Sequence, residues 1–355
     1  MSGAELAAGR ILADAVRDLP GGLGARPTGP DDVDGITALI RAADIAGCGH
    51  TSTNLEEVHH LLALPDCGWG HGAATVWRGD EVVGALMVHD GLAHGRGWMV
   101  DLYSRPGDPR AHGINGALID AALREGRARF DLVFPDPDEP MQSAKTIPYA
   151  NDGALRADLE ERGFAEVRRY WRMKVDHWSV DALGLDDAPS VGAQARADAA
   201  DLASRGYILR PFRDTDEELR GLHEAHSAAF VDHFDFTPLD LEAWVGYVSG
   251  QTDDRTQWLV VEHDGRIVAY AQGANRYAAD DCGYVASVGV VGEHRGQGLA
   301  RALLRARMAD DVARGLISTI LHVDAESPTG ATALYESVGM VVDSEFVGFH
   351  RPLYG

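Results

Sequence analysis

Hydrophobic positions in the second half of the chain recur with two different periods, and the change of period predicts alternating strands and helices. The expected elements are a strand at 207–212, a helix at 216–230, two strands within 257–274, a strand at 283–291, a helix at about 299–315, a strand at 318–323, a short helix at 331–339 and closing strands at 340–353. The sequence His263-Asp264-Gly265 lies between the two strands of 257–274 and is typical of a hairpin turn.

The first half repeats this order of elements. It is expected to contain a hairpin at 73–89, a strand at 97–106, a helix at 114–130, a short strand at 131–136, a short helix at 154–164 and a closing strand at 165–175. Residues 1–24 predict an amphipathic helix, and 178–205 predict a linker with a helical portion. We therefore expect an α/β fold, more closely α+β with a mixed and largely antiparallel sheet, in two tandem domains at 25–177 and 206–355.

Composition narrows the class of protein. With 355 residues, the chain is long enough for two separate cores, and its net charge of −23 argues against nucleic acid as a partner. It has no apolar run long enough to span a membrane, and charged residues interrupt the first stretch, so no cleavable signal is expected and a cytoplasmic location is favoured. Cys48, Cys67 and Cys282 are too scattered for a disulfide framework or a metal-binding pair.

The segment "RGQGLAR" (295–301) stands between a predicted strand and a predicted helix. Gly296 and Gly298 allow positive φ and leave room for a ligand beside the main chain. The first amides of a helix lack acceptors, the helix dipole adds positive potential there, and Arg295 and Arg301 add charged donors. The segment therefore predicts a pyrophosphate site. It lacks the lysine–serine/threonine pair of a P-loop and the third glycine of the dinucleotide fingerprint.

The hexapeptide Arg295-Gly296-Gln297-Gly298-Leu299-Ala300 resembles the R/Q-x-x-G-x-G/A acetyl-CoA signature of the GCN5-related N-acetyltransferases. The preceding Val288-Gly289-Val290 and the following "ALYESVGM" (333–340) are similar to two further hallmarks of that superfamily. The resemblance is strong over 207–355. Over 25–175 it depends mainly on the order of elements, and together the halves look like a tandem member.

The resemblance implies that acetyl-CoA is the co-substrate and that no metal is required. Backbone groups of Val288, Gly289 and Val290 would bond the pantetheine arm, and the amides from Arg295 to Arg301 would surround the pyrophosphate. Ser327 stands where the family commonly has an asparagine that contacts the cofactor. Tyr335 matches the family's tyrosine that protonates the leaving thiolate, although a core tyrosine would also fit.

The general base is not identified by the sequence. Relatives often carry a glutamate on the strand before the glycine turn, where this chain has Tyr284, Val285 and Ala286. The candidates elsewhere are His322, Asp324, Asp232, His233 and Asp235, and deprotonation through water alone is also open. His223 and His226, one helical turn apart, lack a third metal ligand and are interpreted as a surface pair.

In the first half, the segment Arg110-Ala111-His112-Gly113-Ile114-Asn115 replaces the signature, and Leu159 replaces the tyrosine. This indicates a degenerate copy that supports the active half, although it could still bind coenzyme A.

The chain is thus predicted to be an acetyl-CoA-dependent N-acetyltransferase acting by direct transfer in a ternary complex. The expected acceptor is a small polar amine, such as a secondary metabolite, an amino sugar or a thiol-precursor amine, with no nucleic acid or membrane partner. The alternatives are a non-catalytic sensor of acyl-CoA and an acyltransferase with a non-acetyl donor. Both a monomer and a homodimer fit the sequence.

Overall fold

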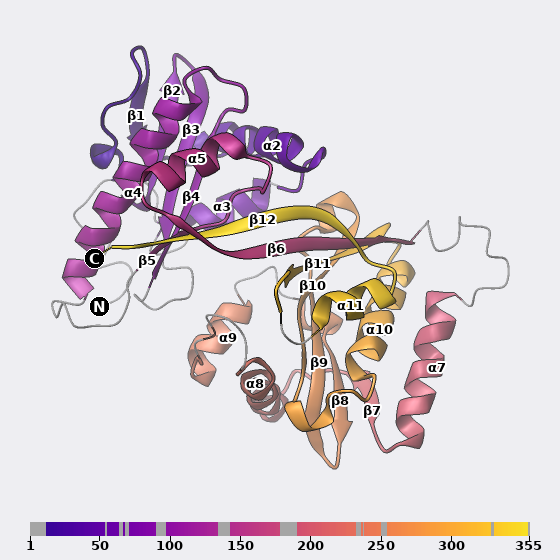
Figure 1. Ribbon diagram of the computed structural model, residues 1–355. Coiled ribbons are helices and arrows are strands. Elements are labelled where there is room, and N and C mark those ends of the chain that lie inside the picture. The colour runs from indigo at the N-terminus through magenta and orange to yellow at the C-terminus, as the bar shows by residue number, and fades with distance from the viewer. Residues whose placement is uncertain are drawn as a thin grey trace. The chain divides into compact units, whose positions relative to one another are not determined.

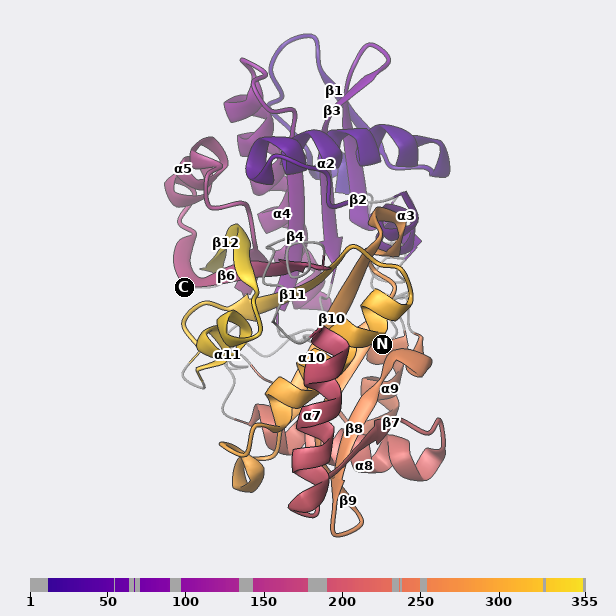
Figure 2. The same ribbon diagram turned by 90° about the vertical axis from the view of Figure 1, so that its right-hand side faces the viewer.

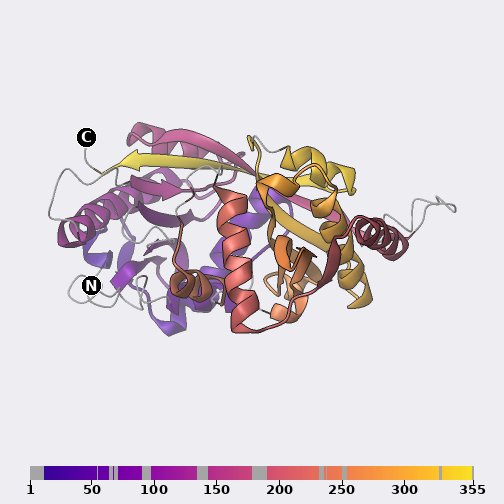
Figure 3. The ribbon, with the colours of Figure 1, turned by 90° about the horizontal axis from the view of Figure 1, so that it is seen from below.

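The computed structural model describes residues 12–53, 55–63, 67, 71–89, 97–133, 143–177, 190–231, 236, 238–249, 254–327 and 330–353. They form two compact units. The first unit combines the residues up to Tyr170 with those from Ser344 onward, and the second unit is Trp171–Asp343. The chain enters the second unit within strand β6 (Ala165–Asp176) and returns to the first within β12 (Val341–Pro352), the yellow strand of Figures 1 and 3. This division differs from the predicted boundaries, because each unit includes strand residues that the prediction assigned to the other domain.

In the first unit, the strands follow the order β1-β2-β3-β4-β5-β12. Their bounds are Gly24–Pro27 for β1, Ala73–Arg78 for β2, Glu81–His89 for β3, Gly97–Ser104 for β4 and Ser143–Thr146 for β5. The β4–β5 pair is parallel, and the other pairs described for this unit are antiparallel. Helices α2 (Val33–Cys48) and α3 (Leu55–Ala63) pack on one face, and α4 (Ala111–Val133) and α5 (Gly153–Glu161) pack on the other (Figure 1).

The second unit repeats this plan with the strand order β6-β11-β10-β9-β8-β7. The bounds are Ile208–Pro211 for β7, Leu259–His263 for β8, Arg266–Ala274 for β9, Cys282–Val290 for β10 and Ser318–Asp324 for β11, and β10–β11 is the parallel pair. Helices α8 (Asp216–Phe230) and α9 (Leu241–Ser249) cover one face. Helices α7 (Val191–Ser204), α10 (Leu299–Ala313) and α11 (Ala331–Ser337) cover the other (Figures 1 and 2). The expected mixed α/β fold is confirmed.

Local signals account for the elements that were predicted well. Asp264 and Gly265 both have positive φ, as a two-residue hairpin turn requires, with values of 49° and 74°. Helix α8 starts after Thr215, whose side chain accepts from the amide of Glu218, and its first turn is acidic, which suits the helix dipole. The predicted helix at 216–230 matches α8, and the predicted hairpin at 257–274 matches β8 and β9.

Other predicted elements need correction or lie outside the described residues. The strand predicted at 131–136 is wrong over 131–133, because α4 continues to Val133, and 134–136 lie outside the described residues. The described strand that pairs with β4 here is β5, at Ser143–Thr146. Of the helix predicted over 1–24, the described part contains only a 3-10 turn at Leu12–Ala15, followed by β1. The helical portion of the predicted linker is α7. Among the described helices, none is long and apolar enough to cross a bilayer.

A buried charge pair joins α10 to the sheet of the second unit. The side chains of Arg307 and Asp311 are each only 1% exposed, and Arg307 Nη2 lies 2.6 Å from Asp311 Oδ1. The second oxygen of Asp311 accepts from Thr319 Oγ1 on β11 at 2.6 Å. Burial raises the pKa of Asp311, and the neighbouring guanidinium and hydroxyl oppose that rise. The carboxylate therefore depends on these partners to remain ionised in the core.

Thr319→Val is expected to lower the free energy of unfolding by about 2 kcal/mol, because it leaves one oxygen of a buried carboxylate without its donor. Urea unfolding measures this change. The matched control is Thr256→Val, which removes an exposed hydroxyl that also donates to a carboxylate, that of Asp254. The control should cost less than about 0.5 kcal/mol. Equal losses in the two variants would contradict the prediction.

Candidate active site

Strand β10 carries a bulge that sets which side chains face each layer of helices. Its register against β9 shifts between Val285 and Ser287, which leaves Ala286 as the additional residue. Val285 and Val288 pack in the core beneath α10 and α11, whereas Ser287 bonds to a tyrosine on the opposite face, beneath α8. The bulge therefore gives the α8–α9 face a polar side chain near the end of the strand.

The second half of β10 has one unpaired edge within the described structure. Its parallel pairing with β11 ends at Val285, whereas its antiparallel pairing with β9 continues to Val290. The amide of Val291 donates to a carbonyl of β9. Because successive peptide groups of a strand point to opposite sides, those of Val288 and Val290 point away from β9. This edge can accept an extended, amide-bearing ligand as an added strand.

The glycine loop after β10 has backbone geometry that could accommodate an anion. Gly296 and Gly298 have φ values of 76° and 79°, and Gly298 is the N-cap of α10 without any side-chain cap. The first helical bond is made by the amide of Ala302 to the Gly298 carbonyl. In the described part of the chain, the amides of residues 296 to 301 have no acceptor, whereas that of Arg295 is used in a turn with Gly292. Six consecutive amides are thus available to a diphosphate.

The two arginines of the loop have different positions. The guanidinium of Arg295 donates to the carbonyls of Val290 and Ala229, so it links the loop to the C-terminal end of α8. Arg301 folds back toward the loop, with Nη2 3.5 Å from the position that a Cβ on Gly298 would occupy. Arg205, which the sequence analysis missed, donates to the carbonyl of Gln297 at 3.1 Å. Two guanidinium groups therefore lie close to the available amides.

Tyr335 lies on α11, in the same hydrophobic cluster as Val285 and Leu321, and Val288 packs against that cluster. Its side chain is buried, and burial raises the pKa of Tyr335 to about 12, so the hydroxyl keeps its proton throughout the neutral range. The described residues provide no hydrogen-bond acceptor for this hydroxyl. Ser327 lies in the loop after β11, where its amide donates to the carbonyl of Asp324.

Comparison with known proteins agrees with this geometry. Residues 219–340 match the acetyltransferase (GNAT) family. A mycothiol acetyltransferase of Thermobispora bispora is 37% identical over 320 residues, which cover 87% of this chain and 92% of the relative. The chain belongs to the GNAT acetyltransferase family. Another mycothiol acetyltransferase, from Kocuria rhizophila, is 33% identical over 87% of this chain and 92% of its own length.

Solved structures show the same tandem GNAT architecture. A GCN5-related N-acetyltransferase from Sphaerobacter thermophilus superimposes with a TM-score of 0.76 and 25% identity, covering 95% of this chain and 98% of the other. A tandem GNAT protein from the clavulanic acid biosynthesis pathway has a TM-score of 0.63 and 16% identity, over 93% and 98% of the two chains. These structures show that the fold is that of a tandem GNAT protein. The family match and the sequence relatives show that the protein is an N-acetyltransferase, and acetyltransferases of this family use acetyl-CoA as co-substrate.

The candidate bases of this GNAT protein have contrasting environments. Burial, together with Arg276 and Arg172, lowers the pKa of His322 to about 3, so its imidazole is neutral and a poor proton acceptor at neutral pH. Asp324 is buried and accepts from the amide of Glu326, which gives it a role in shaping the loop. The three remaining candidates, Asp232, His233 and Asp235, lie outside the described residues.

The interpretation of His223 and His226 as a surface pair is wrong. Both side chains are partly buried beside Trp244, at ring-centroid distances of 5.5 and 5.7 Å. His223 Nε2 lies 2.8 Å from the carbonyl oxygen of Leu239, and His226 Nδ1 lies 2.6 Å from the hydroxyl of Tyr270. The helical spacing placed the two histidines on one face, but only the structure identifies that face as the one packed on the sheet.

The corresponding region of the first GNAT domain is already occupied by its own side chains. The carboxylate of Asp108 accepts from the amide of Arg110 at 2.9 Å and pairs with Arg78 at 2.6 Å. The hydrogen bond from the Arg110 amide is the main cause of the lowered pKa of Asp108. Leu159, at the position of Tyr335, is fully buried. A carboxylate thus lies just before α4, where the second domain has open amides.

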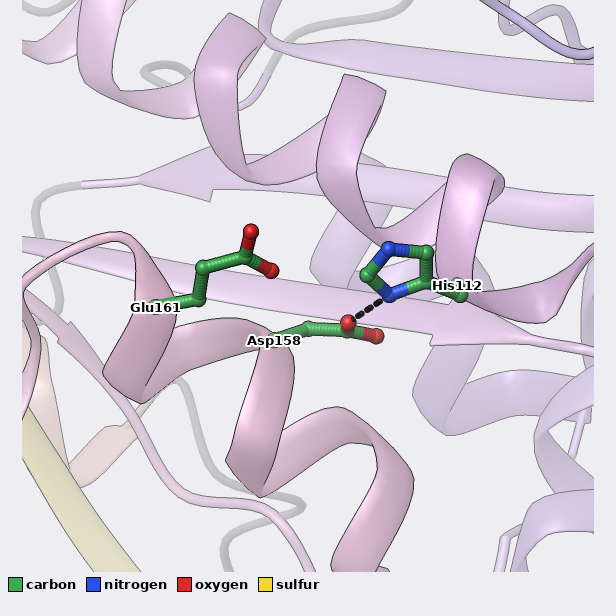
Figure 4. Close-up of side chains that lie close together, drawn as sticks. All are labelled: His112, Asp158 and Glu161. Atoms are coloured by element: carbon green, nitrogen blue, oxygen red, sulfur yellow. Dashed lines mark hydrogen bonds and ion pairs between the residues drawn. The ribbon is translucent and has the colours of Figure 1, made fainter.

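Three side chains near the start of α4 form a compact group, shown in Figure 4. Ligand atoms of His112, Asp158 and Glu161 lie within 4.8 Å of one another. Asp158 contacts His112 with one oxygen and accepts from Asn115 with the other, and Glu161 pairs with Arg162. The group therefore links α4 to α5 through protein partners that already engage both oxygens of Asp158.

Proposed function

We propose that the second unit binds acetyl-CoA along the open edge of β10 and transfers its acetyl group directly to the amine of a small polar molecule in a ternary complex. The main support is the combination of two features of the described residues: the six amides at 296–301 have no acceptor among them, and one edge of β10 is unpaired beyond Val285. The first suits a diphosphate and the second suits the amide-bearing arm of the same molecule. The relatives' name supports a thiol-precursor amine as one acceptor class, besides amino sugars and secondary metabolites.

The residues present fit this co-substrate. A Cβ at Gly296 would meet no atom within 4 Å, so the loop is open to a ligand on that side. Acetyl-CoA supplies an activated thioester. The peptide group of Val288 and the amide of Val290 orient it, the Val290 amide faces its carbonyl oxygen, and Tyr335 donates the proton that the leaving sulfur requires. Arg301 and Arg205 add positive charge beside the diphosphate.

We infer that the first unit has no catalytic role. Asp108 provides a fixed negative charge where a diphosphate would need positive potential, and Leu159 has no proton to donate. One site per chain is therefore expected.

An acceptor screen tests the proposal. The full-length protein is mixed with acetyl-CoA and, separately, with glucosamine, cysteine methyl ester, spermidine or a lysine peptide, and both free thiol and acetylated product are measured. We expect product with at least one small amine and little with the peptide. Thiol release only with longer acyl-CoAs would favour a non-acetyl donor. Binding of acetyl-CoA without any product would favour a sensor and contradict the proposed transfer.

A further inference from the structure

The face of the second unit's sheet that α8 and α9 cover has a row of polar side chains that the proposed binding of acetyl-CoA does not use. Tyr270 and Gln272 are two residues apart on β9, so both point to this face. Ser287, on β10, is paired with Gln272 across the strands. All three lie beside Val288 and Val290, the residues that we propose to orient the thioester.

Three of the side chains on this face form a continuous hydrogen-bonded chain from the sheet to a helix. Ser287 Oγ lies 3.1 Å from the hydroxyl of Tyr270, which in turn lies 2.6 Å from Nδ1 of His226 on α8. Each member can both donate and accept a proton, so a proton can pass from Ser287 through Tyr270 to the imidazole.

The surrounding residues hold this chain rigidly in place. Tyr270 is fully buried, and its ring occupies the space above Gly289, where a Cβ would lie 2.6 Å from the ring. His226 stacks on Phe230 at 4.8 Å, and the rings of Phe236 and Trp244 lie near it. These described neighbours come from α8, the loop before α9, α9 and β9.

Gln272 provides a separate indication that a polar ligand belongs on this face. Its side chain is only 4% exposed, and its Nε2 has no hydrogen-bond partner in the described structure. A buried amide donor without an acceptor costs about 1–3 kcal/mol, which a ligand oxygen placed beside it would offset. An acceptor with a hydroxyl or carbonyl group near its amine would supply that oxygen.

We propose that Ser287, Tyr270 and His226 form the relay that removes the proton from the acceptor amine, with Gln272 Nε2 holding an oxygen of the same acceptor. The inference rests on the proposed function. The amine enters as an ammonium, and one of its protons passes to Ser287 Oγ, the serine proton to Tyr270 and the tyrosine proton to His226 Nδ1, which releases it to solvent. The neutral nitrogen then bonds to the thioester carbon, and its second proton leaves through the same relay to His226. The carbon–sulfur bond then breaks, and the leaving sulfur takes the proton of Tyr335. His226 afterwards loses its proton to solvent and Tyr335 regains one, so charges and protons balance.

The need for such a relay follows from the acceptor's chemistry. An alkylamine with a pKa of about 10.4 is almost entirely protonated at pH 7, and the neutral form costs roughly 4.6 kcal/mol. The other tyrosine–histidine pair on this face, Tyr284 and His322, has its atoms 3.3 Å apart. That pair is a weaker candidate, because burial holds the pKa of His322 at about 3.

Tyr270→Phe keeps the ring but removes the hydroxyl at the centre of the relay. We expect kcat/KM for the best small amine among glucosamine, cysteine methyl ester and spermidine to fall about 100-fold at pH 7, and the loss to shrink as pH approaches the pKa of that amine. Acetyl-CoA affinity, measured by calorimetry, should not change. Ser287→Ala should behave similarly, whereas Tyr284→Phe, the matched control, should keep the pH profile of the wild-type protein.

A second measurement does not depend on turnover. In protein labelled with ¹⁵N-histidine, the Nδ1 signal of His226 should shift in Tyr270→Phe and stay unchanged in Tyr284→Phe. The relay is refuted by an unchanged His226 signal, by wild-type activity of Tyr270→Phe at pH 7, or by a loss that is the same at every pH. Failure of the wild-type protein to acetylate any amine is a different result, because it refutes the proposed function itself.

Discussion

Tyr335→Phe is expected to lower kcat by about 100- to 1,000-fold, because it removes the proton that the leaving sulfur requires and keeps the ring that fills the core beside Met340. Binding of acetyl-CoA should not change, since the diphosphate and pantetheine contacts come from main-chain groups elsewhere. Burial raises the pKa of Tyr335 to about 12, so the wild-type donor should remain protonated, and kcat should show no loss from this group, until the pH approaches that value.

Steady-state kinetics with the best amine of the acceptor screen, together with calorimetry, test this prediction. The control is Tyr103→Phe, which changes a tyrosine packed against α2 and α3 in the first unit. If Tyr335→Phe retained the wild-type kcat, another group or water would be the proton donor. If the control lost as much as Tyr335→Phe, the loss would report on folding and not on proton donation.

Gly296→Asp is expected to weaken acetyl-CoA binding by about 100-fold, because it places a negative charge beside the amides that hold the diphosphate. Two like charges a few ångströms apart near a protein surface repel by a few kcal/mol, which is enough for this effect. Aspartate is among the residues that tolerate positive φ, and a Cβ at this position meets no atom within 4 Å, so the fold should persist. Calorimetry should find one site in the wild-type protein and strongly reduced binding in the variant.

Gly315→Asp provides a matched control at the opposite end of the same helix. Gly315 also has positive φ, 81°, and its Cβ position is also open. Its variant should bind acetyl-CoA like the wild-type protein, with a small loss of stability from the charge near the helix C-terminus. Wild-type affinity in Gly296→Asp, or a second site per chain, would contradict the assignment of the loop.

The elements with strong local signals could be predicted from the sequence. The hairpin around Asp264 and the helix from Thr215 have turn and cap residues that act within a few positions, and the glycine loop combines conformational and charge requirements in one short segment. The element order then indicated the two-fold repeat. These signals depend only on residues close together in the sequence, so a single sequence is sufficient to detect them.

The remaining features depend on contacts between distant residues. Strand β5, "SAKT", has little β-propensity and is identified by its burial and its pairing with β4 and β12. Helices α2, α3 and α9 were not predicted, although α2 ends at Gly49, which has positive φ, and the side chain of Asp240 caps the first turn of α9. The hydrogen bonds that link His226, Tyr270 and Ser287 join residues up to 61 positions apart in the sequence (287 − 226), so no local sequence pattern predicts them.

The path of β6 and β12 has a consequence for how such a protein can evolve. Each compact unit borrows a length of strand encoded in the opposite half of the gene, since residues 171–176 complete the second and 344–352 complete the first. A deletion of residues 1–177 would also remove strand residues of the second unit, with their sheet hydrogen bonds, and would leave a new strand edge exposed. The two units are therefore expected to be retained together, because neither half of the sequence encodes a complete sheet.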